Sequence, residues 1–530
     1  MDIIEKEKKK RTILYGLLVT VLVLIGVTYA YYRITKTQTN SNVIGTRTCL
    51  NTTLTEETSE IVLSDAFPIS DEDGLKQSPF TFTLTNNCDS YVKVTIALVS
   101  EYRTSTNTAY LKDNYVKSNL STKGTNDGSS VILSTLSLGE VDTNTQGYVL
   151  KTTGLKNKEA KSFDLRLWLD SETTNEQGLN KTWKGKIVVS VVAAEYVPTF
   201  AETILANNEV KAPITTPGAA ISTADEAEFA STEDDYGTSY YFRGAVTNNY
   251  VEFANKCWRI VRVSGDGSVK LILHNDNPTG AANPCDSANN SASAAFARYS
   301  ETTYTSAFNT NYNDNAYVGF KYGTVGASDY ATTHANTNNS TILTNLEAWY
   351  NNNLKTYESV IDDNVWCNDK TNVTDETYDP WNYTPNGLGY ANNVTFYGAT
   401  QRLVSSTSGS AGGTGLSLKC NGKLSKITSK IGLITADELA FAGYAAGTTA
   451  GTGNTTTYLQ ENATDTYWWS LSPGNFYGNS ARVWIVGGSS GVFGHRSVGN
   501  TSEVRPSISL KSTTNVTGNG TSSAPYIISM

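Results

Sequence analysis

The sequence predicts a mainly β protein with an N-terminal transmembrane helix, a β-sandwich domain of jelly-roll type and a larger α+β domain. Three observations support this fold class. One uncharged apolar run lies near the N-terminus, and apolar and polar residues alternate with a period of two in many short segments after it. Only 17% of the residues are charged, against a typical value of about 25%, while 31 are tyrosines. This composition favours exposed β-structure and loops.

Residues 13–32 are predicted to cross a membrane as a helix. The stretch contains no charged residue, and at about 1.5 Å per residue it spans roughly 30 Å, the thickness of the bilayer hydrocarbon. Five basic residues at positions 6–11 should stay in the cytoplasm, which places the rest of the chain outside the cell. We therefore expect residues 1–40 to form a cytoplasmic tail and a single-pass cell-membrane anchor, with a helix over about 12–32.

A cleaved signal peptide is the alternative interpretation of this segment. Thr28-Tyr29-Ala30 loosely resembles the small-residue site at which signal peptides are cut. However, the apolar run exceeds the usual signal core of about 7–15 residues, and bulky tyrosines surround the site. These two features favour a retained anchor over a cleaved leader.

Period-two alternation predicts a β-sandwich over residues 41–197. Phe80, Phe82 and Leu84 alternate with threonines, and a second alternating segment follows an asparagine turn. Two further strands are predicted around 163–169 and 187–191. Such alternation gives a sheet with one buried face, and several such strands without a long helix indicate a sandwich or jelly roll.

A linker and a second domain follow. Residues 198–235 contain a short amphipathic piece and then a segment rich in Pro, Ala, Thr and acidic residues, which predicts a flexible spacer. Residues 236–530 begin with a hairpin over 257–273, whose turn is Ser-Gly-Asp-Gly. A helix is predicted after Ser340, and a capping box at Thr435 predicts another, in which Glu438 caps the helix end. The chain then returns to strands.

Six cysteines follow the predicted anchor and are candidates for disulfide bonds in an oxidising compartment. They are Cys49, Cys88, Cys257, Cys285, Cys367 and Cys420. None forms a CxxC pair, which argues against a zinc or thioredoxin-like site. The simplest arrangement joins the first two within the sandwich, and the other four allow three connectivities. Among these we favour Cys257–Cys285 with Cys367–Cys420; six free thiols are the alternative.

One family resemblance lies in the first domain. The segment LSDAFPISDEDGLKQSPFTFTLTNNCDSYVKVTIAL, residues 63–98, resembles the TasA/camelysin-like surface proteins of Gram-positive bacteria. In those proteins an acidic-Gly turn precedes a strand of the type xFxFxLxN. The resemblance implies a jelly-roll module, which in some relatives polymerises by donating a strand. This sequence departs from the family by placing the module between an anchor and a large second domain.

A second resemblance lies near the C-terminus. The order GLITADELAFAGY (432–444), YWWSLSP (467–473), GVFGHRSV (491–498) and VRPSISL (504–510) resembles the formylglycine-generating-enzyme/C-type-lectin-like fold. That fold includes bacterial surface domains with a Trp-rich strand, a glycine-rich hairpin and a final Val-Arg-Pro strand. Catalytic members need paired metal-binding cysteines late in the domain, and no cysteine follows Cys420 here. The resemblance therefore implies a binding scaffold without the family's activity.

The remaining sequence signals predict no enzyme, metal or cofactor. Gly487-Gly488-Ser489-Ser490-Gly491 matches GxSxG, but it joins two predicted strands and is expected to be a hairpin turn. The three histidines have no metal-ligand spacing, and Asp71, Asp73 and Gly74 lack the further ligands of a calcium loop. The net charge is −9 and no long basic stretch follows the anchor, so nucleic acid is not a predicted partner.

Candidate ligand-binding residues lie on the late strands of the second domain, where C-type-lectin-like folds display theirs. They are Tyr477, Trp484, Phe493, His495 and Arg496. Aromatic rings beside Arg can stack on sugars or anchor a protein partner. We therefore expect a cell-surface adhesion or recognition protein for a glycan or protein ligand. The alternative hypothesis is a matrix protein that assembles through the β-sandwich; an enzyme would require a pocket with convergent polar groups.

Overall fold

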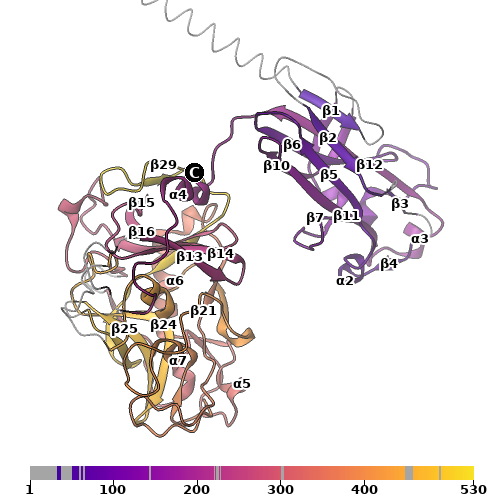
Figure 1. The fold of residues 1–530 in the computed structure, drawn as a ribbon. Coiled ribbons are helices and arrows are strands. Elements are labelled where there is room, and N and C mark those ends of the chain that lie inside the picture. The colour runs from indigo at the N-terminus through magenta and orange to yellow at the C-terminus, as the bar shows by residue number, and fades with distance from the viewer. Residues whose placement is uncertain are drawn as a thin grey trace, which may run out of the picture. The chain divides into compact units, whose positions relative to one another are not determined.

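The computed structural model describes residues 33–37, 51–58, 61–63, 66–142, 145–219, 221, 226, 228–299, 304–447, 457–488 and 491–529. These residues are mainly β, arranged in several largely antiparallel sheets (Figure 1). The chain divides into two compact units, residues 1–197 and 198–530, here called unit 1 and unit 2.

The predicted membrane helix over about 12–32 lies outside the described residues. Within the described part of the chain, no helix is both long and apolar enough to cross a bilayer. The sandwich begins earlier than predicted, because β1 (Arg33–Thr37) already pairs with the last strand of unit 1. The stretch assigned to the tail and anchor, residues 1–40, therefore includes a strand of the first sheet.

Unit 1 contains two sheets with six described strands each. The first has the order β1-β12-β6-β10-β9, with β3 paired to β12, and comprises β3 (Ile61–Leu63), β6 (Val92–Ser100), β9 (Leu138–Asp142), β10 (Thr145–Leu155) and β12 (Trp183–Ala193) besides β1. The second has the order β2-β5-β11-β7-β8, with β4 paired to β11, and comprises β2 (Thr52–Glu56), β4 (Pro68–Ile69), β5 (Phe80–Asn86), β7 (Val116–Thr122), β8 (Val131–Ile132) and β11 (Ala160–Asp170). Short helices connect them: α2 (Asp71–Gly74), α3 (Asn175–Gly178), η1 (Asp113–Tyr115) and η2 (Leu133–Thr135).

The apolar positions of the predicted alternation form the core of unit 1. Phe82 and Leu84 on β5 are fully buried, as are Val94 and Ile96 on β6. They belong to one apolar cluster that draws on both sheets. The strands predicted around 80–98, 163–169 and 187–191 are therefore confirmed, because the period of two places each apolar set on the inner face.

Unit 2 contains a sheet of eight and a sheet of six described strands. The larger one comprises β13 (Glu228–Asp234), β14 (Gly237–Arg243), β15 (Tyr250–Phe253), β16 (Lys256–Val263), β17 (Val269–Asn275), β28 (Ser507–Leu510), β29 (Val516–Thr517) and β30 (Tyr526–Ile528). The smaller one comprises β18 (Thr305–Ala307), β22 (Thr395–Phe396), β24 (Tyr467–Tyr477), β25 (Ser480–Gly487), β26 (Phe493–Ser497) and β27 (Thr501–Glu503). Two further pairs join β19 (Lys321–Tyr322) to β20 (Asn338–Asn339), and β21 (Asn364–Cys367) to β23 (Lys426–Ser429).

Helices of unit 2 pack beside these sheets. They are α4 (Phe200–Asn207), α5 (Tyr330–Thr333), α6 (Thr341–Asn353), α7 (Gly398–Leu403) and α8 (Ala436–Phe441), with single turns η3 (Ser287–Asn289), η4 (Asn315–Val318), η5 (Lys355–Tyr357) and η6 (Lys423–Ser425). Ser340 caps α6, and Thr435 with Glu438 forms the predicted capping box of α8. Both predicted helices are therefore confirmed.

The predicted linker, 198–235, is not a spacer in its described parts. Thr199 and Glu202 form a capping box that starts α4, and Phe200 and Ile204 bury in the core of unit 2. The last part of the interval forms strand β13. The composition suggested a segment unable to bury a core, but a few apolar residues at helical spacing were enough to dock it.

Two disulfides join the cysteines in the favoured pattern. Cys257 bonds to Cys285, and Cys367 bonds to Cys420. Cys88 is also disulfide-bonded, while Cys49, its expected partner, lies outside the described residues. The described cysteines include no free thiol.

Candidate binding surface

Two of the five predicted binding residues lie in the core. Trp484 and Phe493 are each 1% exposed, with ring centroids 4.8 Å apart. The indole nitrogen of Trp484 donates to the Thr400 hydroxyl of α7 at 3.2 Å. Helix α7 packs against β24, the strand that neighbours β25 in the same sheet. Their prediction as ligand-contacting side chains was therefore wrong, because neither ring is presented to solvent.

The strand register separates a third residue from the rest. Trp484 lies opposite His495 on β26, and Val483 lies opposite Arg496. Because neighbouring residues of a strand face opposite sides of the sheet, Arg496 projects away from His495. The Arg496 guanidinium instead lies 4.6 Å from the ring centroid of Tyr467. The five residues therefore do not form one surface.

Tyr477 and His495 do share a surface, together with residues that the sequence did not reveal. The ring of Tyr383 stacks on Tyr477 with centroids 3.7 Å apart and planes 6° apart. The ring of Trp381 meets His495 edge-on at 4.8 Å. Arg482 projects from β25 on the same face as Trp484 and His495, by alternation and register. These residues are half-buried, and we call Trp381, Tyr383, Tyr477, Arg482 and His495 the aromatic surface.

The loop that carries Trp381 and Tyr383 is held by its own hydrogen bonds and by an aromatic base. The Asp379 carboxylate accepts backbone hydrogen bonds from Tyr383 at 2.6 Å and Thr384 at 3.0 Å. Phe396 lies beneath both rings, with centroids 5.6 Å from Trp381 and 5.9 Å from Tyr383. A carboxylate that accepts local N–H groups fixes a turn, so this loop presents its rings in one defined arrangement.

A weak sequence signal marks this loop. Residues 380–385 are Pro-Trp-Asn-Tyr-Thr-Pro, in which two aromatic residues stand in a polar segment between prolines. A loop of this composition lies on the surface. Large aromatic rings grouped at a surface position indicate either packing against another element or a binding role. The partner ring, Tyr477, lies 94 residues further along the chain, so the pairing cannot be deduced from spacing.

The aromatic surface combines a guanidinium, that of Arg482, with an imidazole that is neutral at pH 7. Burial, together with the charge of Arg482, lowers the pKa of His495 to about 4, so its imidazole is neutral at pH 7. Asn475 lies beside it, with its amide nitrogen 3.4 Å from the imidazole Nε2. A neutral imidazole can accept or donate one hydrogen bond, and ring faces stack on apolar sugar faces or on aromatic side chains.

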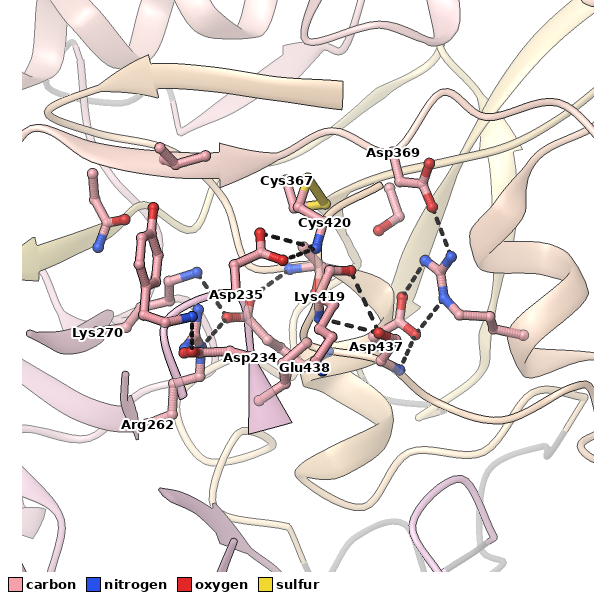
Figure 2. A pocket seen from close by; sticks show the side chains of 18 residues that line it. Asp234, Asp235, Arg262, Lys270, Cys367, Asp369, Lys419, Cys420, Asp437 and Glu438 are labelled. Carbon is pink, nitrogen blue, oxygen red and sulfur yellow. Dashed lines mark hydrogen bonds and ion pairs between the residues drawn. A yellow bond between two sulfur atoms is a disulfide. The ribbon is translucent and has the colours of Figure 1, made fainter. Parts of the chain in front are cut away.

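A second polar region surrounds the Cys367–Cys420 disulfide (Figure 2). Arg402 bridges two carboxylates there, with nitrogen–oxygen distances of 2.6 Å to Asp369 and 2.8 Å to Asp437. The pocket has a volume of about 30 Å³, which holds about two water molecules and no sugar ring. The paired charges and the small volume indicate a structural cluster rather than a ligand site.

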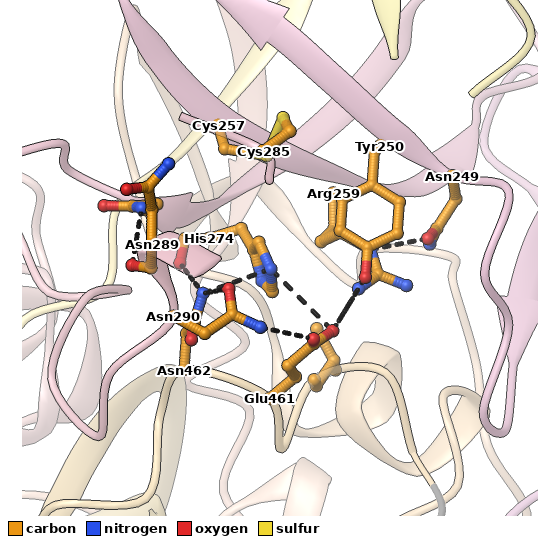
Figure 3. Close-up of polar contacts among 12 residues, drawn as sticks. Asn249, Tyr250, Cys257, Arg259, His274, Cys285, Asn289, Asn290, Glu461 and Asn462 are labelled. Atoms are coloured by element: carbon orange, nitrogen blue, oxygen red, sulfur yellow. Dashed lines mark hydrogen bonds and ion pairs between the residues drawn. A yellow bond between two sulfur atoms is a disulfide. The ribbon is translucent and has the colours of Figure 1, made fainter. Parts of the chain in front are cut away.

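A third cluster centres on Glu461 (Figure 3). Its carboxylate accepts hydrogen bonds from the Tyr250 hydroxyl at 2.8 Å, Arg259 at 2.9 Å and Asn290 at 2.8 Å. Arg259 is fully buried, and its guanidinium lies 3.7 Å from the Tyr250 ring centroid. His274 is buried beside them, and burial holds its pKa well below the ordinary value, so it stays neutral. Each of these groups bonds to or packs against the others, which is typical of a polar network that holds loops in place.

No three His, Cys, Asp or Glu side chains come together as metal ligands within the described ranges. Comparisons with protein-family models, with curated proteins and with solved structures give no match. The site therefore has to be interpreted from its own geometry, and the two family resemblances stay predictions.

Proposed function

We propose that the protein is a membrane-anchored cell-surface protein whose unit 2 is a non-catalytic binding domain for a glycan or protein ligand. The aromatic surface is the observation that carries this proposal. Two stacked tyrosines and a tryptophan are half-buried on a fixed loop and at the end of strand β24, beside a cationic and a neutral polar side chain. Rigid aromatic anchors with adjacent polar groups are typical of recognition surfaces.

The compartment and the finer fold belong to the same proposal. The disulfides of unit 2 and of Cys88 support an oxidising location outside the cytoplasm. The apolar run before Arg33 supplies the anchor, and the sandwich and α+β folds are those of the TasA/camelysin-like and C-type-lectin-like modules that the sequence resembles. The aromatic surface supports a binding function independently of these assignments, because its side chains all belong to unit 2.

The experiment is a glycan and surface-protein array probed with the full chain in detergent. We compare the wild type with the Trp381→Ala/Tyr383→Ala variant, which removes two half-exposed rings from a loop. Tyr236→Ala is the control, because Tyr236 is 51% exposed and lines the small pocket beside the Cys367–Cys420 disulfide, away from the aromatic surface. Trp484→Ala is unsuitable, because it opens a cavity in the core.

The proposal expects a specific ligand that the control variant retains and the loop variant loses. Truncating an aromatic side chain that is a binding hot spot costs about 2 kcal/mol or more, roughly a 30-fold loss of affinity. Thermal unfolding of each variant must match the wild type. A folded wild type that binds nothing, or a ligand that the loop variant retains, would refute the proposal.

A second candidate function, assembly into a surface matrix through unit 1, has one observation in its favour. Phe67 is 81% and Leu179 63% exposed, and they line an apolar groove of about 210 Å³ beside β4 and α3. Exposed apolar surface of this kind favours association between copies. Concentration-dependent sedimentation of the full chain that Phe67→Ser abolishes would support this function; a monomer at all concentrations would exclude it.

A further inference from the structure

The backbone register of unit 1 places its chain entry and chain exit at one end of the sandwich. Arg33, the first residue of β1, lies opposite Val192, near the end of β12. Because the pair is antiparallel, β1 leads away from this end while β12 runs toward it. The apolar run ends at Tyr32, directly before Arg33. A chain that leaves a bilayer after Tyr32 therefore enters the sandwich at this end.

In the described part of unit 1, this end, which we call the basal end, is formed by Asn51 and three connecting segments, residues 87–91, 156–159 and 194–196. The first joins β5 to β6, the second joins β10 to β11, and the third follows β12. Hydrogen bonds between backbone groups hold them together, since Ala194 donates to Tyr91 and Asn86 donates to Glu159. The basal end is therefore a defined surface of unit 1.

The basal end carries two tyrosines and two lysines, residue types found where proteins meet lipid head groups, together with the carboxylates of Asp89, Glu159 and Glu195. The rings of Tyr91 and Tyr196 pack with centroids 5.2 Å apart, and Tyr196 is 39% exposed. The Lys156 ammonium lies 5.0 Å from the Tyr196 ring centroid. Lys158 is exposed and pairs with exposed Asp89 at 3.3 Å, a contact that is worth little in water. Tyrosine favours the membrane interface, and lysine is attracted to anionic head groups.

We propose that the basal end of unit 1 is a membrane-contact surface that rests on the lipid head groups of the bilayer. The proposal depends on the membrane anchoring proposed above, and adds to it an orientation and a lipid contact. Chain connection brings the basal end to the bilayer surface, and Tyr91, Tyr196 and Lys156 supply the contacts. The opposite end of the sandwich, with α3, lies about 36 Å away, the length of the 11-residue strand β12.

The test places one fluorescent label at each end of unit 1 in the full chain. Glu195→Cys lies at the basal end and Glu176→Cys on α3, and both positions are exposed glutamates. The protein is reconstituted in vesicles of phosphatidylcholine and phosphatidylglycerol that carry a nitroxide on the head group. We expect loss of fluorescence at position 195 and none at 176. Lys156→Glu/Lys158→Glu should reduce the loss at 195, whereas Lys181→Glu/Lys184→Glu, near the other end, should not.

Carbonate extraction of the same vesicles separates the two proposals. If the protein stays in the vesicles and position 195 is quenched selectively, the contact surface is supported. If the protein stays and position 195 is not quenched, or both positions are quenched alike, the contact surface is refuted while the anchor stands. If the protein is extracted, the membrane anchoring itself is wrong and the contact surface with it.

Discussion

Replacing Glu438 by Gln should destabilise unit 2 strongly. Its carboxylate is 3% exposed and accepts hydrogen bonds from Arg262 at 2.9 Å and Lys270 at 2.7 Å, while it also closes the capping box of α8. Burial alone would raise its pKa, but the two cations more than offset burial and hold the pKa at about 2.

The size of this destabilisation follows from the pKa difference and from the buried cations that lose their counterion. A carboxyl group with a pKa of 4.5 in the unfolded chain and about 2 in the fold contributes about 3 kcal/mol at neutral pH. The variant also leaves Lys270, itself 3% exposed, without its counterion, and breaking a buried pair costs about 3–5 kcal/mol. We therefore expect the free energy of unfolding of unit 2 to fall by about 3–5 kcal/mol at pH 7.

The pH dependence has a definite sign. Because the folded pKa lies below the unfolded one, the contribution of Glu438 is complete above pH 4.5 and is lost as the pH falls toward 2. The wild type should lose stability over this range, and Glu438→Gln should lose about 3 kcal/mol less of it. Urea unfolding read by hydrogen exchange of peptides from 432–444 measures unit 2 separately from unit 1.

Two further variants make this reasoning refutable. Glu438→Gln/Lys270→Met removes both partners and should be less destabilised than Glu438→Gln alone, because no uncompensated ammonium stays buried at this position. Glu376→Gln, at an exposed position, should change the free energy of unfolding by less than about 0.5 kcal/mol. A loss below about 1 kcal/mol for Glu438→Gln, or a double variant worse than the single one, would show that the pairing energy is misjudged.

Two other predictions concern unit 2. Cys367→Ser/Cys420→Ser should lower the free energy of unfolding by about 4 kcal/mol, because the bond closes a separation of 53 residues; unchanged urea midpoints with and without reductant would contradict this. His495 should titrate near pH 4 in NMR spectra of imidazole-labelled protein, with its stability contribution complete above pH 6.5 and falling between 6.5 and 4; a midpoint near 6.5 would show that its ring is solvated.

The parts of the fold that local signals specify could be predicted from the sequence. Leu346 and Trp349 lie at helical spacing behind Ser340, and the helix begins where the cap places it. The strands of unit 1 follow from alternation, since each apolar set has one face to bury. The Val-Arg-Pro strand start singled out by the second resemblance also supports the fold, since Arg505 is fully buried and donates to the carbonyl of Leu273 at 2.8 Å.

The candidate site was predicted less well, because its geometry depends on distant partners. The aromatic residues of β25 and β26 lie in the sheet that carries the aromatic surface, but their alternation does not say which face another element covers. Helix α7 and Phe493 cover the face at Trp484, so that ring belongs to the core. The half-buried rings of the aromatic surface come largely from Trp381 and Tyr383, whose positions only the tertiary fold sets against β24.

Buried arginines hold the long loops of unit 2 in place, although this unit has few helices. Long connections bury backbone carbonyls that no sheet or helix satisfies, and an unpaired buried carbonyl is costly. Arg243 is fully buried and donates to the carbonyls of Ala440 and Phe441, at the end of α8. Arg505 donates to Leu273 and, at 2.6 Å, to Leu459. A guanidinium suits this role because it offers five donors in a fixed plane.

One of these buried arginines, Arg505, also packs against the strand that ends in the aromatic surface. Burial lowers the pKa of Arg505 to about 10, which leaves it charged at pH 7 and able to donate all its hydrogen bonds. Arg505 lies between β27 and β28, and its guanidinium is 5.0 Å from the ring centroid of Trp468 on β24. Strand β24 ends at Tyr477, within the aromatic surface. Because a surface ordered before binding loses less entropy on association, fixing β24 from inside the fold favours the binding that we propose for the aromatic surface.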